Sequence, residues 1–96
     1  MTEYQIMKAH KIAKHYGLNK QKFQALQELN ELSNVLLRRQ DQIQNRAEHK
    51  NNLIDEMADV YVMLKQLETL YHIDQRTIED RITFKLNRQL DRIKEE

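Results

Sequence analysis

Apolar residues recur at helical spacing along most of the chain, and their pattern predicts four helices. The first stripe of apolar residues runs from Glu3 to Tyr16. Thr2 and Gln5 before it have the spacing of a capping box, in which each residue's side chain bonds the other's backbone N–H. Gly17, the only glycine, is a natural helix stop because it adopts positive φ without strain. We therefore expect a helix over Glu3 to Tyr16.

A second helix is expected from an Asn19 cap to about Gln40. Its apolar stripe is Ala25, Leu29, Leu32 and Leu36, widened by Phe23, Leu26 and Leu37. Residues 41 to 51, polar apart from Ile43 and Ala47, show no clear period and are expected to form a connector that is partly helical or mobile.

The third and fourth helices begin at polar residues suited to capping. Asn52, with Asp55 three positions later, is expected to open a helix whose stripe is Leu53, Met57, Val60, Leu64, Leu67 and Tyr71. Asp74 is expected to cap the last helix, whose core face is Ile78, Ile82, Leu86 and Ile93.

Composition supports an all-α fold in one domain. The chain has no proline and is rich in helix-forming residues, and its 96 residues, 1–96, show no repeat or boundary. A core of this size gives modest stability unless a partner covers more apolar surface. We expect a four-helix bundle completed by oligomerisation.

The charge balance argues against several partner classes. With 16 Lys and Arg against 15 Asp and Glu, the net charge is +1, so no overall field favours nucleic acid. The longest apolar run, from Val60 to Leu64, is far too short to span a bilayer, and no secretory segment begins the chain. No cysteine is present, which fits a reducing compartment. A cytoplasmic protein without a membrane partner is expected.

Two acidic pairs carry the main chemical signal. Glu28 and Glu31 border the second stripe, and Glu56 and Asp59 border the third. Residues three apart on a helix lie about 60° apart around the axis, so each pair can present two oxygens to one ion. Hard oxygen ligands suit Mg²⁺ or Mn²⁺. The alternative is that both pairs are solvated helix flanks; a diiron site is disfavoured because no E-x-x-H pair occurs.

A cationic ridge is predicted along one edge of the last helix. It consists of Arg81, Lys85, Arg88 and Arg92. Arginine and lysine hold phosphate oxygens, and a divalent ion offsets charge on a leaving phosphate. The acidic pairs and the basic ridge together indicate metal-assisted cleavage of a phosphoanhydride. The ridge alone is also typical of a solvated face that pairs with a neighbouring helix.

These residues resemble the MazG-like nucleoside triphosphate pyrophosphohydrolases, an all-α family with the signature E-x-x-E followed by E-x-x-D. The match is Glu28, Glu31, Glu56 and Asp59. Supporting context is His15-Tyr16-Gly17, the segment from Glu56 to Val60, and Lys85 followed by Arg88 and Arg92. The resemblance covers about residues 15 to 93. Gln27 stands where family members often carry a further glutamate.

The resemblance implies Mg²⁺-dependent hydrolysis of an NTP or dNTP to a nucleoside monophosphate and pyrophosphate. It implies Glu28, Glu31, Glu56 and Asp59 as metal ligands, with a glutamate activating water, and Lys85, Arg88 and Arg92 as phosphate contacts. It also implies a homodimer or homotetramer. Nucleotide-pool control, removal of altered nucleotides and removal of dUTP remain open as roles. The alternative from another class is a noncatalytic, homo-oligomeric helical interaction protein, whose charged edges set its pairing.

Overall fold

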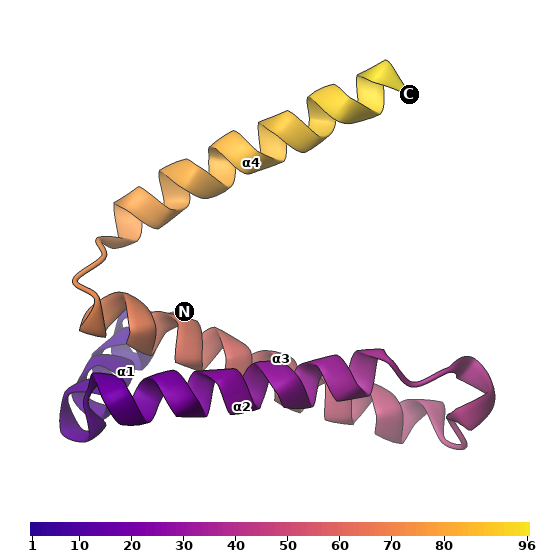
Figure 1. The fold of residues 1–96 in the computed structure, drawn as a ribbon, viewed down its shortest axis with the longest axis horizontal. Coiled ribbons are helices and arrows are strands. Elements are labelled where there is room, and N and C mark those ends of the chain that lie inside the picture. Colours follow the sequence, from indigo (N-terminus) through magenta and orange to yellow (C-terminus); the bar gives the residue numbers. More distant parts are fainter.

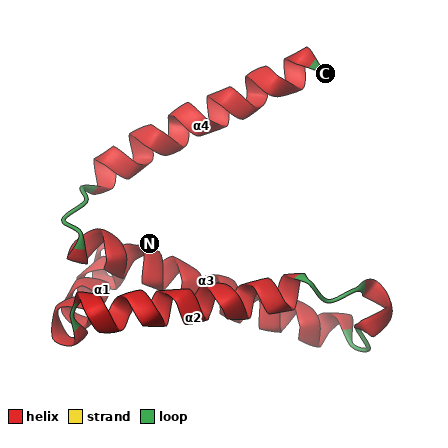
Figure 2. Ribbon diagram, in the orientation of Figure 1, coloured by secondary structure: helices red, strands yellow, loops and turns green.

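The protein is all-α, as expected. A computed structural model describes all 96 residues and contains no strand. Its elements are α1 (Glu3–Tyr16), α2 (Leu18–Leu36), the short 3₁₀ helix η1 (Gln40–Gln42), α3 (Arg46–Leu70) and α4 (Gln75–Glu95) (Figures 1 and 2). No helix is both long enough and apolar enough to cross a membrane.

The predicted bounds of α1 are confirmed, and so are both of its end signals. Thr2 N donates to Gln5 Oε1 at 2.8 Å, and Gln5 N donates to Thr2 Oγ1 at 3.1 Å, which completes the capping box. Gly17 has φ +83°, a conformation that favours glycine, and it ends the helix. The expected Asn19 cap is wrong: α2 begins at Leu18, because the Gly17 carbonyl already accepts from Gln21 N.

The ends of the connector differ from the prediction. The second helix stops at Leu36 rather than Gln40, and Arg39 is extended before η1. The third helix begins six residues before Asn52, because Asn45 is its cap: Asn45 Oδ1 accepts from Glu48 N at 3.1 Å. Most of the expected connector is therefore helical.

The core lies where α2 and α3 run antiparallel and where α1 packs across one end of this pair (Figure 1). Its buried apolar residues are mostly small: Ala9, Ala13, Ala25, Val35 and Met63. Small side chains let helix backbones approach closely, but they remove little apolar surface from water. One chain thus has a narrow core.

A buried amide pair links α2 to α3 inside this core. Gln21 and Gln66 are 5% and 2% exposed, and Gln21 Nε2 donates to Gln66 Oε1. A hydrogen bond satisfies both groups, whereas an unpaired buried amide costs about 1–3 kcal/mol. The pair therefore fixes how the two helices meet.

We expect Gln66→Leu to lower the free energy of unfolding by about 1–3 kcal/mol, because Gln21 loses its partner. Urea titration followed by circular dichroism measures the change. The double variant with Leu at both positions is the control, since it leaves no unpaired amide and should recover most of the loss. A double variant as unstable as the single one contradicts this assignment.

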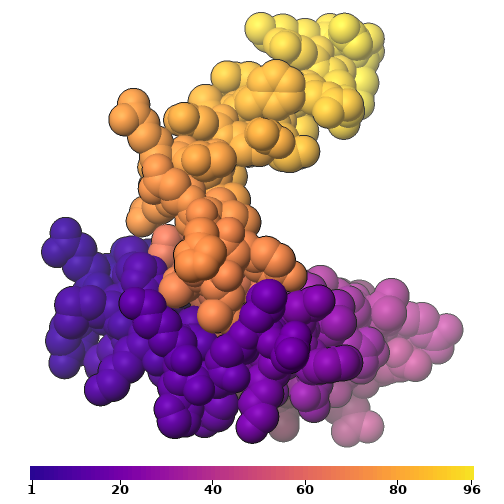
Figure 3. Space-filling model, turned by 60° about the vertical axis from the view of Figure 1, so that its left-hand side comes forward, coloured from indigo at the N-terminus to yellow at the C-terminus, as the bar shows by residue number.

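The fourth helix stands apart from the other three. The contacts between helices join α1, α2 and α3, while α4 extends into solvent after the turn at residues 71 to 74 (Figures 1 and 3). Its expected core face is uncovered, with Ile82, Leu86 and Ile93 all at least half exposed and Ile78 partly covered. A single chain therefore packs three helices together, and the expected four-helix bundle is not closed within it.

Candidate metal centre

Three of the four predicted carboxylates meet between α2 and α3. One oxygen each from Glu28, Glu31 and Glu56 lie within 4.8 Å of one another. Glu28 and Glu31 are one helical turn apart on α2, and the antiparallel packing brings Glu56 of α3 opposite them. We call these three residues the acidic cluster.

The acidic cluster is half-buried and lacks compensating positive charge. All three residues are partly covered, and the only ion pairs in the structure, Arg39–Asp41 and Lys65–Glu68, involve none of them. Glu28 Oε2 and Glu56 Oε2 are enclosed and have no hydrogen-bond partner. Covered carboxylates without a compensating charge are unfavourable, so the arrangement favours a bound cation.

A neighbouring amide orients Glu28. Gln24, one turn earlier on α2, donates from Nε2 to Glu28 Oε1 at 2.7 Å. This bond occupies one oxygen of Glu28 and leaves Oε2, the enclosed oxygen, for another partner. Groups that hydrogen-bond a metal-binding side chain in this way fix its orientation.

Asp59 lies beside the acidic cluster but is exposed. Its pKa is raised above the ordinary value of 3.8, first by partial desolvation and then by repulsion from the nearby carboxylates of Glu28 and Asp55. Asp59 is therefore close enough to Glu28 to feel its charge, which places the fourth predicted residue beside the same centre.

This raised pKa predicts how metal-free stability depends on pH. The folded state holds the Asp59 proton more tightly than the unfolded state, so ionisation of Asp59 opposes folding. As pH rises from the ordinary value of 3.8 through the raised pKa, the metal-free protein should lose stability from this group. The urea midpoint of wild type minus that of Asp59→Asn should fall across this range. A difference that is flat or rises with pH contradicts the account.

The donor set fits a hard divalent cation. Carboxylate oxygens are the ligands that Mg²⁺ and Mn²⁺ prefer, and there is no cysteine and no histidine within the cluster. Oxygens on opposite sides of Mg²⁺ lie about 4.2 Å apart, so the 4.8 Å spread is close to that of a ligand set. Glu28, Glu31 and Glu56 are the residues that would hold the ion, with Asp59 at its edge.

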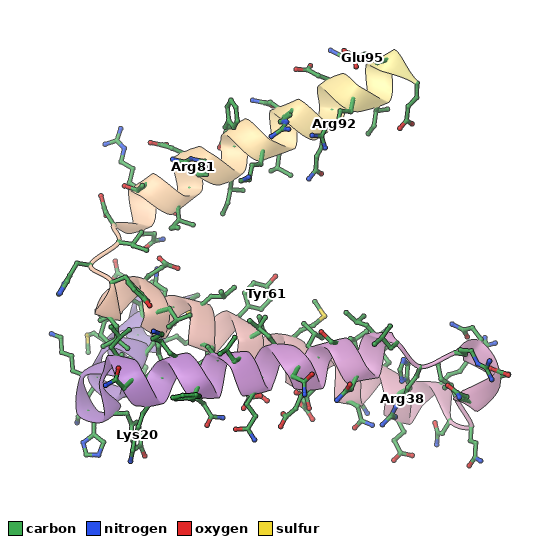
Figure 4. The ribbon with its side chains drawn as sticks, in the orientation of Figure 1. Lys20, Arg38, Tyr61, Arg81, Arg92 and Glu95 are labelled. Atoms are coloured by element: carbon green, nitrogen blue, oxygen red, sulfur yellow. The ribbon has the colours of Figure 1, made fainter.

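The predicted phosphate contacts are not brought to this centre within one chain. Lys85, Arg88 and Arg92 are exposed on α4, which projects away from α2 and α3 (Figure 4). Gln27 is also exposed and is not part of the acidic cluster. The structure thus joins the acidic half of the expected site and separates it from the basic half.

A polar cavity, which the pattern of apolar residues does not predict, lies at the connector end of the α2–α3 pair. This cavity has a volume of about 240 Å³, and its lining includes Arg38, Asn45, His49 and Asn52. Arg38 is labelled in Figure 4. The His49 Nδ1 atom is enclosed without a partner. His49 precedes Glu56 by seven residues, which places it on the same face of α3, about 10 Å along the axis. That seven-residue spacing was the available signal.

Comparisons with known protein families, curated proteins and solved structures find no match to this chain.

Proposed function

We propose that the protein is a nucleoside triphosphate pyrophosphohydrolase, which hydrolyses an NTP or dNTP to a nucleoside monophosphate and pyrophosphate with Mg²⁺, or Mn²⁺, at the acidic cluster. Its proposed setting is the cytoplasm, and its proposed active form is a homo-oligomer. The resemblance of the E-x-x-E and E-x-x-D pairs to the MazG-like signature supports the reaction class.

One observation carries the proposal. Three half-buried carboxylates from two helices converge within 4.8 Å, with enclosed oxygens on Glu28 and Glu56 that no protein group satisfies. A divalent ion bound there supplies the positive charge that polarises a phosphate and acidifies a water.

The protein's own residues then have distinct tasks. Glu28, Glu31 and Glu56 would hold the divalent ion, and Gln24 orients the Glu28 side chain. Asp59 is our choice of proton acceptor from the attacking water, because it is exposed beside the cluster and its pKa is raised. The cavity at Arg38 and His49 offers polar groups to the part of the substrate that extends along α2 and α3.

A panel of canonical and modified NTPs and dNTPs, incubated with Mg²⁺ and separated by chromatography, tests the proposal. We expect at least one substrate to give monophosphate and pyrophosphate. Release of orthophosphate would point to a different bond cleavage. Inactivity on the whole panel, together with no metal-dependent nucleotide binding, would contradict the proposal.

A second candidate is the noncatalytic, homo-oligomeric interaction protein, and the exposed apolar surface favours it. Only 7 of 96 residues are buried, and large apolar side chains are exposed on all four helices. The two candidates differ in what the acidic cluster does. Loss of its charges should harm assembly in an interaction protein, but should harm turnover and spare assembly in an enzyme.

A further inference from the structure

The chain exposes far more surface than a compact monomer of its size. Its accessible surface is 8320 Å², whereas about 5900 Å² is typical of a folded monomer of 11.7 kDa. Its radius of gyration is 16.4 Å, against about 12 to 13 Å for a compact domain of 96 residues. The excess of roughly 2400 Å² per chain exceeds the approximately 800 Å² that each partner buries in a standard interface. A stable pairing of copies thus has ample surface.

The excess surface includes exposed apolar residues along one side of α2 and α3, which we call the open face. On α3 it consists of Met57, Tyr61 and Leu64, which share a side by their spacing; on α2 it includes Leu29 and Leu36. All five are more than 40% exposed. Figure 4 shows Tyr61 on the side of α3 that faces α4.

Glu31 and Asp59 lie on the side of the α2–α3 pair opposite the open face, and Glu28 and Glu56 lie between the two helices. Residues two apart on a helix differ by about 200° around its axis. Leu29 is two residues before Glu31, and Tyr61 is two residues after Asp59. The apolar side therefore turns toward α4, and the side that carries Glu31 and Asp59 turns away from it.

The fourth helix has an apolar face and a cationic edge, and neither has a partner within the chain. Ile82, Leu86 and Ile93 follow one face, and Arg88 and Arg92 lie along its edge. Figure 1 shows α4 apart from α2 and α3, and Figure 3 shows its C-terminal part rising away from them. An amphipathic helix held away from its own core needs another surface to cover its apolar face.

We infer that two copies pair through their open faces and that α4 of each copy extends over the acidic cluster of the other. With the open faces together, the partner's α2–α3 pair occupies the space beneath α4 and turns the side that carries Glu31 and Asp59 toward that helix. Lys85, Arg88 and Arg92 then complement the partner's acidic cluster in charge. The pairing stands on surface and charge alone, while the cations' role as phosphate ligands rests on the proposed function.

The first test is the mass of the protein in solution by light scattering. Wild type should have about twice the chain mass of 11.7 kDa. Tyr61→Glu, which puts a charge on the open face, should give the single-chain mass. Phe23→Glu is the matched control, because Phe23 is an exposed aromatic residue of α2 that lies about 200° around the helix axis from the buried Gln21, and it should leave the dimer intact. A monomeric wild type, or a Tyr61→Glu variant with the wild-type mass, overturns the inference.

Cross-linking tests the exchange of α4 without disrupting the fold, and the chain's lack of cysteine makes it clean. One tagged copy carries Gln24→Cys beside the acidic cluster, and a differently tagged copy carries Arg88→Cys. A short bismaleimide should join the two copies, whereas Thr83→Cys, on the other side of α4, should react poorly. A chain carrying both cysteines, diluted in excess wild type, reports the alternative in which α4 folds back on its own chain. Linkage only within that chain, or no linkage between copies, overturns the exchange.

Subunit mixing addresses the cations. Glu56→Gln and Arg88→Ala copies should each have little turnover alone, but after co-refolding they should regain up to about a quarter of the wild-type rate. Half of a random mixture is heterodimer, and each heterodimer has one intact site of two. If wild type is active and cross-linking shows that heterodimers form, but the mixture regains no turnover, then the cations serve the site of their own chain. That result overturns their exchange. Inactivity of wild type, with the cross-link intact, counts against the proposed function only.

Discussion

Glu56→Gln should lower turnover by about 10² to 10³-fold, the range found when a group that stabilises transition-state charge is removed. Glu56 is the only member of the acidic cluster that α3 contributes, and its Oε2 is enclosed without a protein partner. Glutamine keeps the shape of the side chain but removes the charge that would hold a divalent ion. Pyrophosphate release at saturating Mg²⁺ measures the effect.

Two controls make this result specific. Circular dichroism and light scattering should show that the variant keeps its helix content and its assembly. Glu3→Gln makes the same change at an exposed position in the first turn of α1 and should keep the wild-type rate. Wild-type turnover in Glu56→Gln would remove this residue from the metal site. Loss of assembly with turnover would favour the interaction protein.

Mg²⁺ or Mn²⁺ should raise the melting temperature of wild type substantially. Binding to the folded state alone adds about 2.7 kcal/mol of stability at a concentration 100 times the dissociation constant. For a domain of this size that corresponds to roughly 10 to 20 °C. Repulsion among Glu28, Glu31 and Glu56 lowers the stability of the metal-free protein, and a bound metal would offset this repulsion.

Thermal unfolding with Mg²⁺ and with EDTA measures this stabilisation. Glu28→Gln should lose most of the metal-dependent increase, and its metal-free form should melt at or above the metal-free wild type, because one repelling charge is gone. K⁺ at equal ionic strength controls for screening. The same increase in wild type and Glu28→Gln would show that the ion acts elsewhere.

Local signals in the sequence predicted the local structure well. The capping box of Thr2 and Gln5 and the glycine stop gave α1 its observed bounds. The predicted start of the third helix was too late because both Asn45 and Asn52 are suitable caps. The structure uses Asn45, whose side-chain oxygen accepts from Glu48 N. Such a choice depends on hydrogen bonds that a pattern of apolar residues does not encode.

The acidic half of the site was predictable, and its basic half was not. The spacing of Glu28, Glu31 and Glu56 placed them at stripe edges, and the packing of α2 on α3 brings them together. The apolar pattern of α4 predicted a helix with a covered face, but not which surface covers it. Nothing in a single sequence distinguishes packing within a chain from packing between copies, because both bury the same stripe.

The ratio of pyrophosphate to nucleoside monophosphate, measured with Mg²⁺ and again with EDTA, tests the central claim most directly. For any nucleoside triphosphate that the protein hydrolyses, the account predicts one pyrophosphate for each monophosphate, formation that depends on the metal, and its loss in EDTA. Orthophosphate with nucleoside diphosphate, or hydrolysis at the same rate in EDTA, would contradict it.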